Sequence, residues 1–145
     1  MNNKSRPRVV VIGAGFGGLA AAVALRRKGI DDLLIVERAD GVGGTWRQNI
    51  YPGAACDIQS HLYSFSFAPN RAWSRTYANQ PEILAYLETV ADDFDLRRHL
   101  MLGTAVAGWS GTKKLCTGRW NWTATAQTGG LSRTSSSALS DCSTP

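Results

Sequence analysis

The sequence predicts an α/β fold with a parallel sheet, and three consecutive features predict it. An apolar run at Val9–Ile12 is followed by a glycine-rich turn, then by a helical pattern ending at Gly29, then by a second apolar run at Leu33–Val36. Short apolar runs of this kind are typical of buried parallel strands, and a helix between two of them forms a βαβ unit. We expect one domain in the 145-residue chain, because 43% hydrophobic residues can form one modest core.

The glycine-rich turn has the spacing of the dinucleotide-binding fingerprint of Rossmann-like domains. Gly13, Gly15 and Gly18 stand between the first predicted strand and the helix. We expect Gly13 to make the tight turn, Gly15 to let a pyrophosphate approach the backbone, and Gly18 to let the helix pack closely on the sheet. The phosphates would then lie at the helix N-terminus, where free amide donors and the positive end of the dipole meet them.

The second predicted strand ends at an acidic residue in the position that the fingerprint requires. Glu37 follows Gly18 by 19 residues, about where a carboxylate that binds a ribose 2′-hydroxyl is expected. A carboxylate there would repel a 2′-phosphate, so the site should prefer FAD or NAD over NADP. An ordinary strand-to-helix turn is the alternative explanation of these glycines.

The composition limits the other classes of function. The formal net charge of +5 owes much to residues 110–145, so we do not expect a nucleic-acid partner. No run of residues has the length and apolar character of a membrane span or a signal peptide, and we expect a cytoplasmic protein without a membrane partner. Three cysteines and two histidines at long spacings fit no zinc site, so we expect no metal.

The middle of the chain reads as a segment shaped around a ligand. Three glycines free the Asp40–Trp46 loop to pass close to a ligand, and aromatic, glycine and hydrogen-bonding residues are dense over Tyr51–Phe67. A flexible connector is the alternative for this loop. Beyond it, Gln80–Asp95 has the apolar spacing of a helix, with Pro81 in its first turn, and Leu100–Val106 is a candidate short strand.

Several motifs in this middle segment resemble one family. Five short stretches are similar to the FAD-binding N-terminus of class B flavoprotein monooxygenases: Gly43–Trp46, Tyr51–Gly53, Cys56–Asp57, Ser60–Phe65 and Tyr77–Ile83. The branch they resemble most is the Baeyer-Villiger type, and the resemblance covers roughly residues 8 to 106. It implies a partial, three-layer, Rossmann-like FAD-binding domain over residues 8–109.

The resemblance also implies a set of site residues. It implies that Asp57 lies near the isoalloxazine and orients a positively charged partner from a later NADP domain, which makes Asp57 the one candidate catalytic residue. Ala55 stands where the family often has arginine, so one polar contact near the flavin would be missing. The implied cofactor-binding residues are Gly13, Gly15, Gly18 and Glu37 for the ADP half of FAD, Gly44, Thr45 and Trp46 along the flavin side, Asp57, Tyr63, and Val106 through its backbone beside the adenine.

Residues 110–145 differ in composition from the rest. They contain 14 Ser or Thr and no Val, Ile, Phe, Tyr or Met, so we expect a disordered, low-complexity tail that cannot complete the sheet. The tail also suggests an out-of-frame translation. Read one base earlier, the codons of Trp120-Asn121 must include a glutamate codon, those of Trp122-Thr123 an aspartate codon, and those of Asp141-Cys142 a leucine codon. We therefore hypothesise a reading-frame slip near Trp109–Gly111.

By resemblance, the function is that of an FAD-dependent monooxygenase. In that family NADPH reduces FAD, and a peroxyflavin inserts one oxygen atom into a small organic substrate such as a ketone or a heteroatom compound. This chain shows no second glycine-rich strand-helix unit for NADPH, and we expect it to be an inactive N-terminal fragment. The alternatives are a non-catalytic FAD- or NAD-binding remnant and, less favoured, a fragment of an NAD-dependent dehydrogenase.

Overall fold

The parallel sheet predicted from the sequence is present. The computed structural model describes residues 9–111, 120–128 and 131–138. In these ranges β1 (Val9–Ile12), β2 (Leu33–Val36) and β3 (Leu100–Met101) form a parallel sheet in the order β1-β2-β3. The predicted bounds of the first two strands are confirmed.

The helix α1 (Phe16–Arg27) connects β1 to β2, as the βαβ pattern predicts. Gly15 caps its N-terminus, and Gly29 adopts a φ of +76° just beyond its end, where the Gly29 amide donates to the Arg26 carbonyl at 2.9 Å. A glycine in this left-handed conformation is the usual end of a helix. The buried side chains of α1 are Leu19, Ala22 and Val23.

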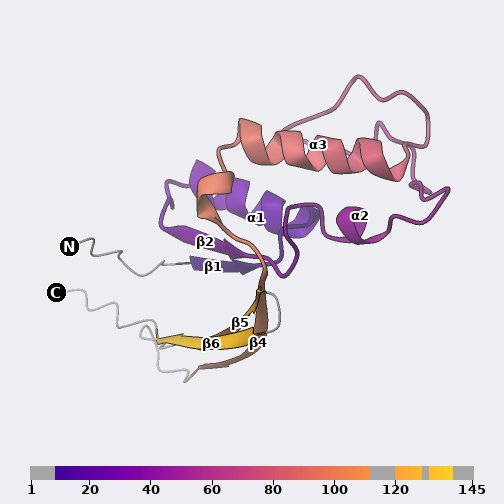
Figure 1. The fold of residues 1–145 in the computed structure, drawn as a ribbon. Helices are drawn as coiled ribbons and strands as arrows, with labels where there is room; N and C mark the ends of the chain where they lie inside the picture. Colours follow the sequence, from indigo (N-terminus) through magenta and orange to yellow (C-terminus); the bar gives the residue numbers. More distant parts are fainter. Residues whose placement is uncertain (1–8, 112–119, 129–130, 139–145) are drawn as a thin grey trace.

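A second long helix, α3 (Gln80–Asp93), packs near α1 (Figure 1). Its N-cap is Asn79, whose side-chain oxygen accepts a hydrogen bond from the Glu82 amide at 3.3 Å. The helix ends two residues earlier than predicted, and a 3₁₀ turn, η1 (Arg97–His99), leads to β3. The buried residues of α3 are Gln80, Ile83, Tyr86, Leu87, Val90 and Ala91.

The prediction of one strand over Leu100–Val106 is wrong. The structure divides this stretch into β3 and β4 (Thr104–Gly111), which belong to different sheets. Gly103 has a φ of +62° between them, a conformation that side chains other than glycine rarely adopt. The turn at Gly103 therefore redirects the chain away from the parallel sheet.

Within residues 110–145, the structure describes residues 110–111, 120–128 and 131–138. Two segments within them, β5 (Trp120–Thr128) and β6 (Leu131–Ala138), pair antiparallel in a second sheet of order β4-β5-β6. Neither strand pairs with β1–β3 in the described residues, so the tail does not extend the parallel sheet there.

The predicted three layers are visible in Figure 1. The helices α1 and α3 lie on one side of the parallel sheet, and the β4–β6 sheet lies on the other. The main core lies between the helices and the parallel sheet, where Leu19, Ile35 and Leu87 are fully buried. None of the helices in the described ranges is long and apolar enough to cross a bilayer.

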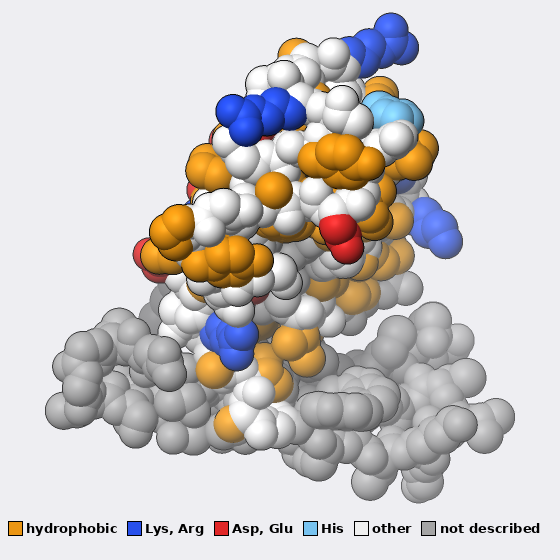
Figure 2. All heavy atoms as spheres, turned by 90° about the vertical axis from the view of Figure 1, so that its right-hand side faces the viewer, with side chains coloured by type: hydrophobic (Ala, Val, Ile, Leu, Met, Phe, Trp, Pro, Cys, Tyr) orange, Lys and Arg blue, Asp and Glu red, His pale blue; other side chains and the backbone are white. Residues whose placement is uncertain are grey.

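The segment 49–79 has no long helix or strand and is held by backbone bonds and aromatic packing. The Cys56 amide donates to the Ala78 carbonyl at 3.0 Å, and the Ser60 amide donates to the Thr76 carbonyl at 2.7 Å. Five of its large hydrophobic side chains remain exposed: Ile50, Tyr51, Ile58, Leu62 and Tyr77. Figure 2 shows hydrophobic side chains gathered on the side of the molecule where this segment lies.

Candidate dinucleotide-binding site

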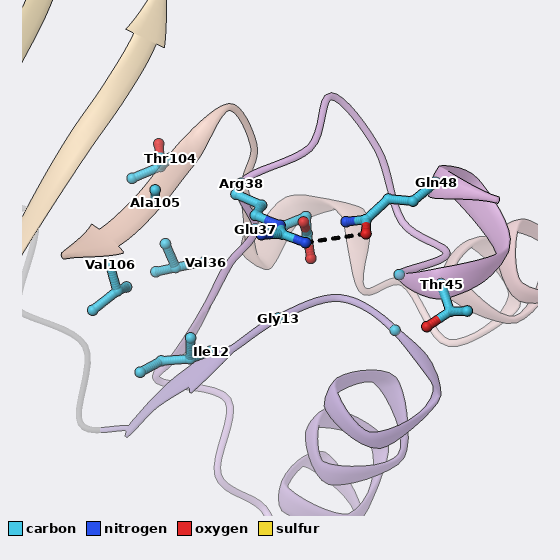
Figure 3. Close-up of a pocket in the computed structure, with 12 residues that line it drawn as sticks. Ile12, Gly13, Val36, Glu37, Arg38, Thr45, Gln48, Thr104, Ala105 and Val106 are labelled. Atoms are coloured by element: carbon cyan, nitrogen blue, oxygen red, sulfur yellow. Dashed lines mark hydrogen bonds between the residues drawn. The ribbon is translucent and has the colours of Figure 1, made fainter. Parts of the chain in front are cut away.

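A cavity of about 460 Å³ opens at the carboxyl ends of β1 and β2 (Figure 3). This is the edge of an open α/β sheet where ligands bind. Four elements contribute to it: the β1–α1 turn, the end of β2, the short helix α2 (Thr45–Gln48) and the start of β4. The lining residues are Ile12, Gly13, Gly15, Val36, Glu37, Arg38, Gly44, Thr45, Gln48, Thr104, Ala105 and Val106.

The β1–α1 turn has the geometry that the fingerprint predicts. Gly13 has a φ of +93°, and its amide donates to the Val36 carbonyl at 2.7 Å. A Cβ atom on Gly18 would lie 1.8 Å from the Gly13 carbonyl oxygen, so only glycine allows this contact between helix and turn. Gly15 lines the cavity at the N-terminus of α1, where unpaired amides and the helix dipole favour an anion.

A second glycine-rich loop, Gly41–Gly44, lies directly against this turn. The Gly43 amide donates to the Ala14 carbonyl at 2.9 Å, and a Cβ atom on Gly44 would lie 2.9 Å from the Gly15 Cα. Gly44 also has a φ of +56°. Because neither Gly15 nor Gly44 has a side chain, the two backbones come into contact, and together they form one wall of the cavity.

Glu37 is buried, with only 5% of its surface exposed, and both of its carboxylate oxygens accept backbone hydrogen bonds. One oxygen accepts from the Ala14 amide at 2.7 Å and the other from the Ala39 amide at 2.8 Å. Glu37 thus connects the β1–α1 turn to the end of β2, a structural role that its sequence position did not reveal. A carboxylate has about four acceptor positions, so a ribose hydroxyl can still bind here.

The mouth of the cavity is bridged by two residues that the sequence analysis missed. The Arg38 guanidinium donates to the Gln48 side-chain oxygen at 3.0 Å, which links the end of β2 to α2 (Figure 3). Gln48 lies three residues after Thr45, and residues at this spacing share one face of a helix. That spacing was the one signal in the sequence for Gln48.

The start of β4 closes the far side of the cavity. The Thr104 amide donates to the Glu37 carbonyl at 2.9 Å, which places Thr104 and Val106 in the lining. Val106, Val36 and the exposed Ile12 give this end an apolar surface. The cavity therefore offers anion-binding amides at one end, a carboxylate in the middle and apolar side chains at the other end, which is the arrangement a dinucleotide needs.

Not all of the predicted site residues line the cavity. Gly18 acts through packing, and the indole of Trp46 donates instead to the Tyr63 hydroxyl at 3.1 Å. Asp57 is exposed and is not part of the lining. The flavin-side roles of Trp46, Asp57 and Tyr63 remain predictions. In the described ranges, no group of three or more His, Cys, Asp or Glu is arranged to hold a metal.

Known proteins with similar sequences include nucleotide-binding domains, in agreement with this geometry. A family described as an NAD(P)-binding Rossmann-like domain matches residues 11–79. A Baeyer-Villiger monooxygenase of Streptomyces coelicolor is 65% identical over 99 residues, which are 68% of this chain and 19% of that protein. Over these residues the chain is similar to the Baeyer-Villiger monooxygenases.

Solved structures of flavin monooxygenases show the same fold. An oxidized steroid monooxygenase bound to NADP has a TM-score of 0.73 and 47% identity, over 80% of this chain and 22% of its own. OTEMO in complex with FAD and NADP has a TM-score of 0.73 and 31% identity, over 88% of this chain and 24% of its own. This chain thus spans about a fifth of the length of these matching proteins.

Proposed function

We propose that the cavity binds FAD through its ADP half, as the FAD-binding part of an NADPH-using Baeyer-Villiger type monooxygenase. The observation that carries the proposal is the contact between Gly15 and Gly44 beside the N-terminus of α1, where a Cβ on either residue would lie within 3.4 Å of the other backbone. OTEMO, which shares the fold, is a complex with FAD and NADP.

Each part of the cavity would hold one part of the cofactor. Gly13 and Gly15 would bind the pyrophosphate through backbone amides at the start of α1, and Glu37 would accept a hydrogen bond from the ribose. Val106 and Ile12 would contact the adenine, and the Arg38–Gln48 bridge would cover the mouth. Bound FAD would supply the redox chemistry, which is the acceptance of hydride from NADPH and the activation of oxygen for insertion into a small organic substrate such as a ketone.

We also propose that Asp57 pairs with a cationic group outside this chain's described residues. An exposed carboxylate outside the cavity lining is free to pair with a cationic group from another part of a longer homologous chain. The exposed side chains of Ile50, Tyr51 and Leu62 would in such a chain be covered by further domains. We therefore propose that this chain alone binds the cofactor without turning over substrate.

Two measurements test this function. Purified protein should carry a yellow flavin spectrum, or acquire it on reconstitution with FAD, and should show no steady NADPH-dependent oxygen uptake. Protein that binds NAD but not FAD would support the dehydrogenase alternative instead, and colourless protein that binds neither would leave only an inactive remnant. Binding of NADP tighter than NAD would contradict the role of Glu37, because a carboxylate repels a 2′-phosphate.

We also propose that residues 8–109 are the cofactor-binding unit and that 110–145 are a separate segment produced by a frame slip near Trp109–Gly111. The match with the Streptomyces relative includes 68% of the chain, which leaves about a third outside it. The nucleotide sequence of the gene tests this. A stop codon in the earlier frame, or no apolar strand encoded there, would contradict it. We also propose that the protein is cytoplasmic.

A further inference from the structure

Arg47 packs against the Gly41–Gly44 loop and donates hydrogen bonds to three partners, one of which is in the loop. Its Nε donates to the Val42 carbonyl at 2.7 Å, its Nη1 donates to Asp40 Oδ1 at 3.3 Å, and its Nη2 donates to Glu88 Oε1 at 2.5 Å. Glu88 belongs to α3, so the guanidinium connects the loop to a long helix of the core. The side chain is only 25% exposed.

The glycines of the loop let its backbone pack closely against the Arg47 side chain. A Cβ atom on Gly41 would lie 2.4 Å from the Arg47 guanidinium, and a Cβ on Gly43 would lie 3.1 Å from the Arg47 Cβ and 2.4 Å from Leu84 Cδ1. The loop backbone is therefore pressed between α3 and its own arginine. A side chain at Gly41 would displace the Arg47 guanidinium, and Gly43 has a φ of +129°, a conformation that favours glycine.

The opposite side of the same loop forms the back of the proposed phosphate site. The Gly43 amide is bonded to the Ala14 carbonyl, and Gly44 lies against Gly15. Arg47 itself does not line the cavity, and its charge is already paired with Asp40 and Glu88. Direct attraction between this guanidinium and a phosphate is therefore weak, and Arg47 acts by fixing the position of the Gly41–Gly44 loop.

We infer that Arg47 is a positioning residue, which holds the Gly41–Gly44 loop against the phosphate-binding turn and thereby sets the affinity for the diphosphate of FAD. This inference rests on the proposed FAD site. Arg47 does not line the adenosine end of the cavity, which Glu37 and Val106 form from other elements. Loss of Arg47 should thus weaken binding of the diphosphate far more than binding of the nucleoside.

The test compares Arg47→Met with Arg97→Met in the purified full chain. Arg97 makes a comparable bidentate pair with Asp92 of α3, but this pair is exposed and lies outside the cavity lining. We expect Arg47→Met to raise the FAD dissociation constant about tenfold, measured by quenching of flavin fluorescence, and to change the adenosine dissociation constant less than about twofold. Arg97→Met should change neither, and Arg47→Lys should recover part of the loss, because lysine keeps the charge without the fork of donors.

A ligand-free measurement keeps the inference separate from the proposed function. Hydrogen exchange of the Gly43 amide should be faster in Arg47→Met than in the parent and in Arg97→Met, because the loop is released from the turn. If Arg47→Met does not fold, Glu88→Gln provides the same comparison. Equal exchange at Gly43 in all variants, or an equal loss of FAD and adenosine binding, would overturn the inference. Parent protein that binds no FAD would refute the proposed function, while the exchange at Gly43 would still decide the role of Arg47.

Discussion

Gly18→Ala should destabilise the chain because there is no space for one methyl group between α1 and the turn. The added Cβ would lie 1.8 Å from the Gly13 carbonyl oxygen and 2.9 Å from its carbon, whereas real Cβ contacts are essentially never shorter than 3.0 Å. The two closest atoms belong to the backbone of the β1–α1 turn, so they cannot rotate aside as a side chain could. The helix and the turn must therefore separate.

The magnitude follows from two opposing effects. Overpacking of this kind costs about 1–3 kcal/mol, and the upper end applies here because backbone must move. Alanine in place of glycine in a helix returns about 1 kcal/mol. The net loss in the free energy of unfolding should then be about 2 kcal/mol.

Urea unfolding followed by circular dichroism measures this loss, with Gly17→Ala as the matched control. Gly17 is the neighbouring residue of the same helix, and a Cβ there would have nothing within 4 Å. Gly17→Ala should therefore stabilise the chain by up to about 1 kcal/mol. If both variants change the stability in the same direction and by similar amounts, the assigned packing role of Gly18 is refuted.

Two further changes test the packing of the 49–79 segment. Tyr86→Phe should lower the free energy of unfolding by about 1–3 kcal/mol at neutral pH, because the Phe65 amide and the Ala68 carbonyl, both 2.8 Å from the hydroxyl, lose their partner. Burial raises the pKa of Tyr86 above its ordinary 10.0, so the unfolded chain releases this proton first; stability should fall as the pH rises above about 10, and pH-dependent denaturant titrations of Tyr86→Phe should lack that component. Leu62→Ser, at a side chain that is 68% exposed, should change stability by less than about 0.5 kcal/mol but lower the binding of a hydrophobic dye; unchanged dye fluorescence would contradict an accessible apolar surface there.

The local signals in the sequence predicted the centre of the fold. Each of these signals comes from residues that are close together in the chain: the apolar runs Val9–Ile12 and Leu33–Val36, and the glycine spacing between them. The βαβ unit and the position of Glu37 could therefore be predicted without knowledge of any long-range contact. Gly103 is a single residue whose positive φ has no sequence signature of its own, and the division of β3 from β4 was missed.

The contacts around the cavity depend on residues that are distant in the chain. Glu37 accepts from the Ala14 amide across 23 positions, and Arg47 donates to Glu88 across 41. The sequence contains both partners but not their proximity. The motif alone therefore predicts that Glu37 binds the ribose. The hydrogen bond from the Ala14 amide to Glu37, and those that Arg47 donates to Val42, Asp40 and Glu88, are seen only in the structure.

The dissociation constant for FAD tests the central claim most directly. Flavin titration of the purified chain should show saturable binding of one FAD per chain. Gly15→Val should abolish it, because a Cβ on Gly15 would already lie 3.4 Å from the Gly44 Cα, so the branched side chain would push the loop away from the turn or extend into the cavity that Gly15 lines. No saturable binding by the parent chain, or equal binding by folded Gly15→Val, would contradict the assignment of this cavity to FAD.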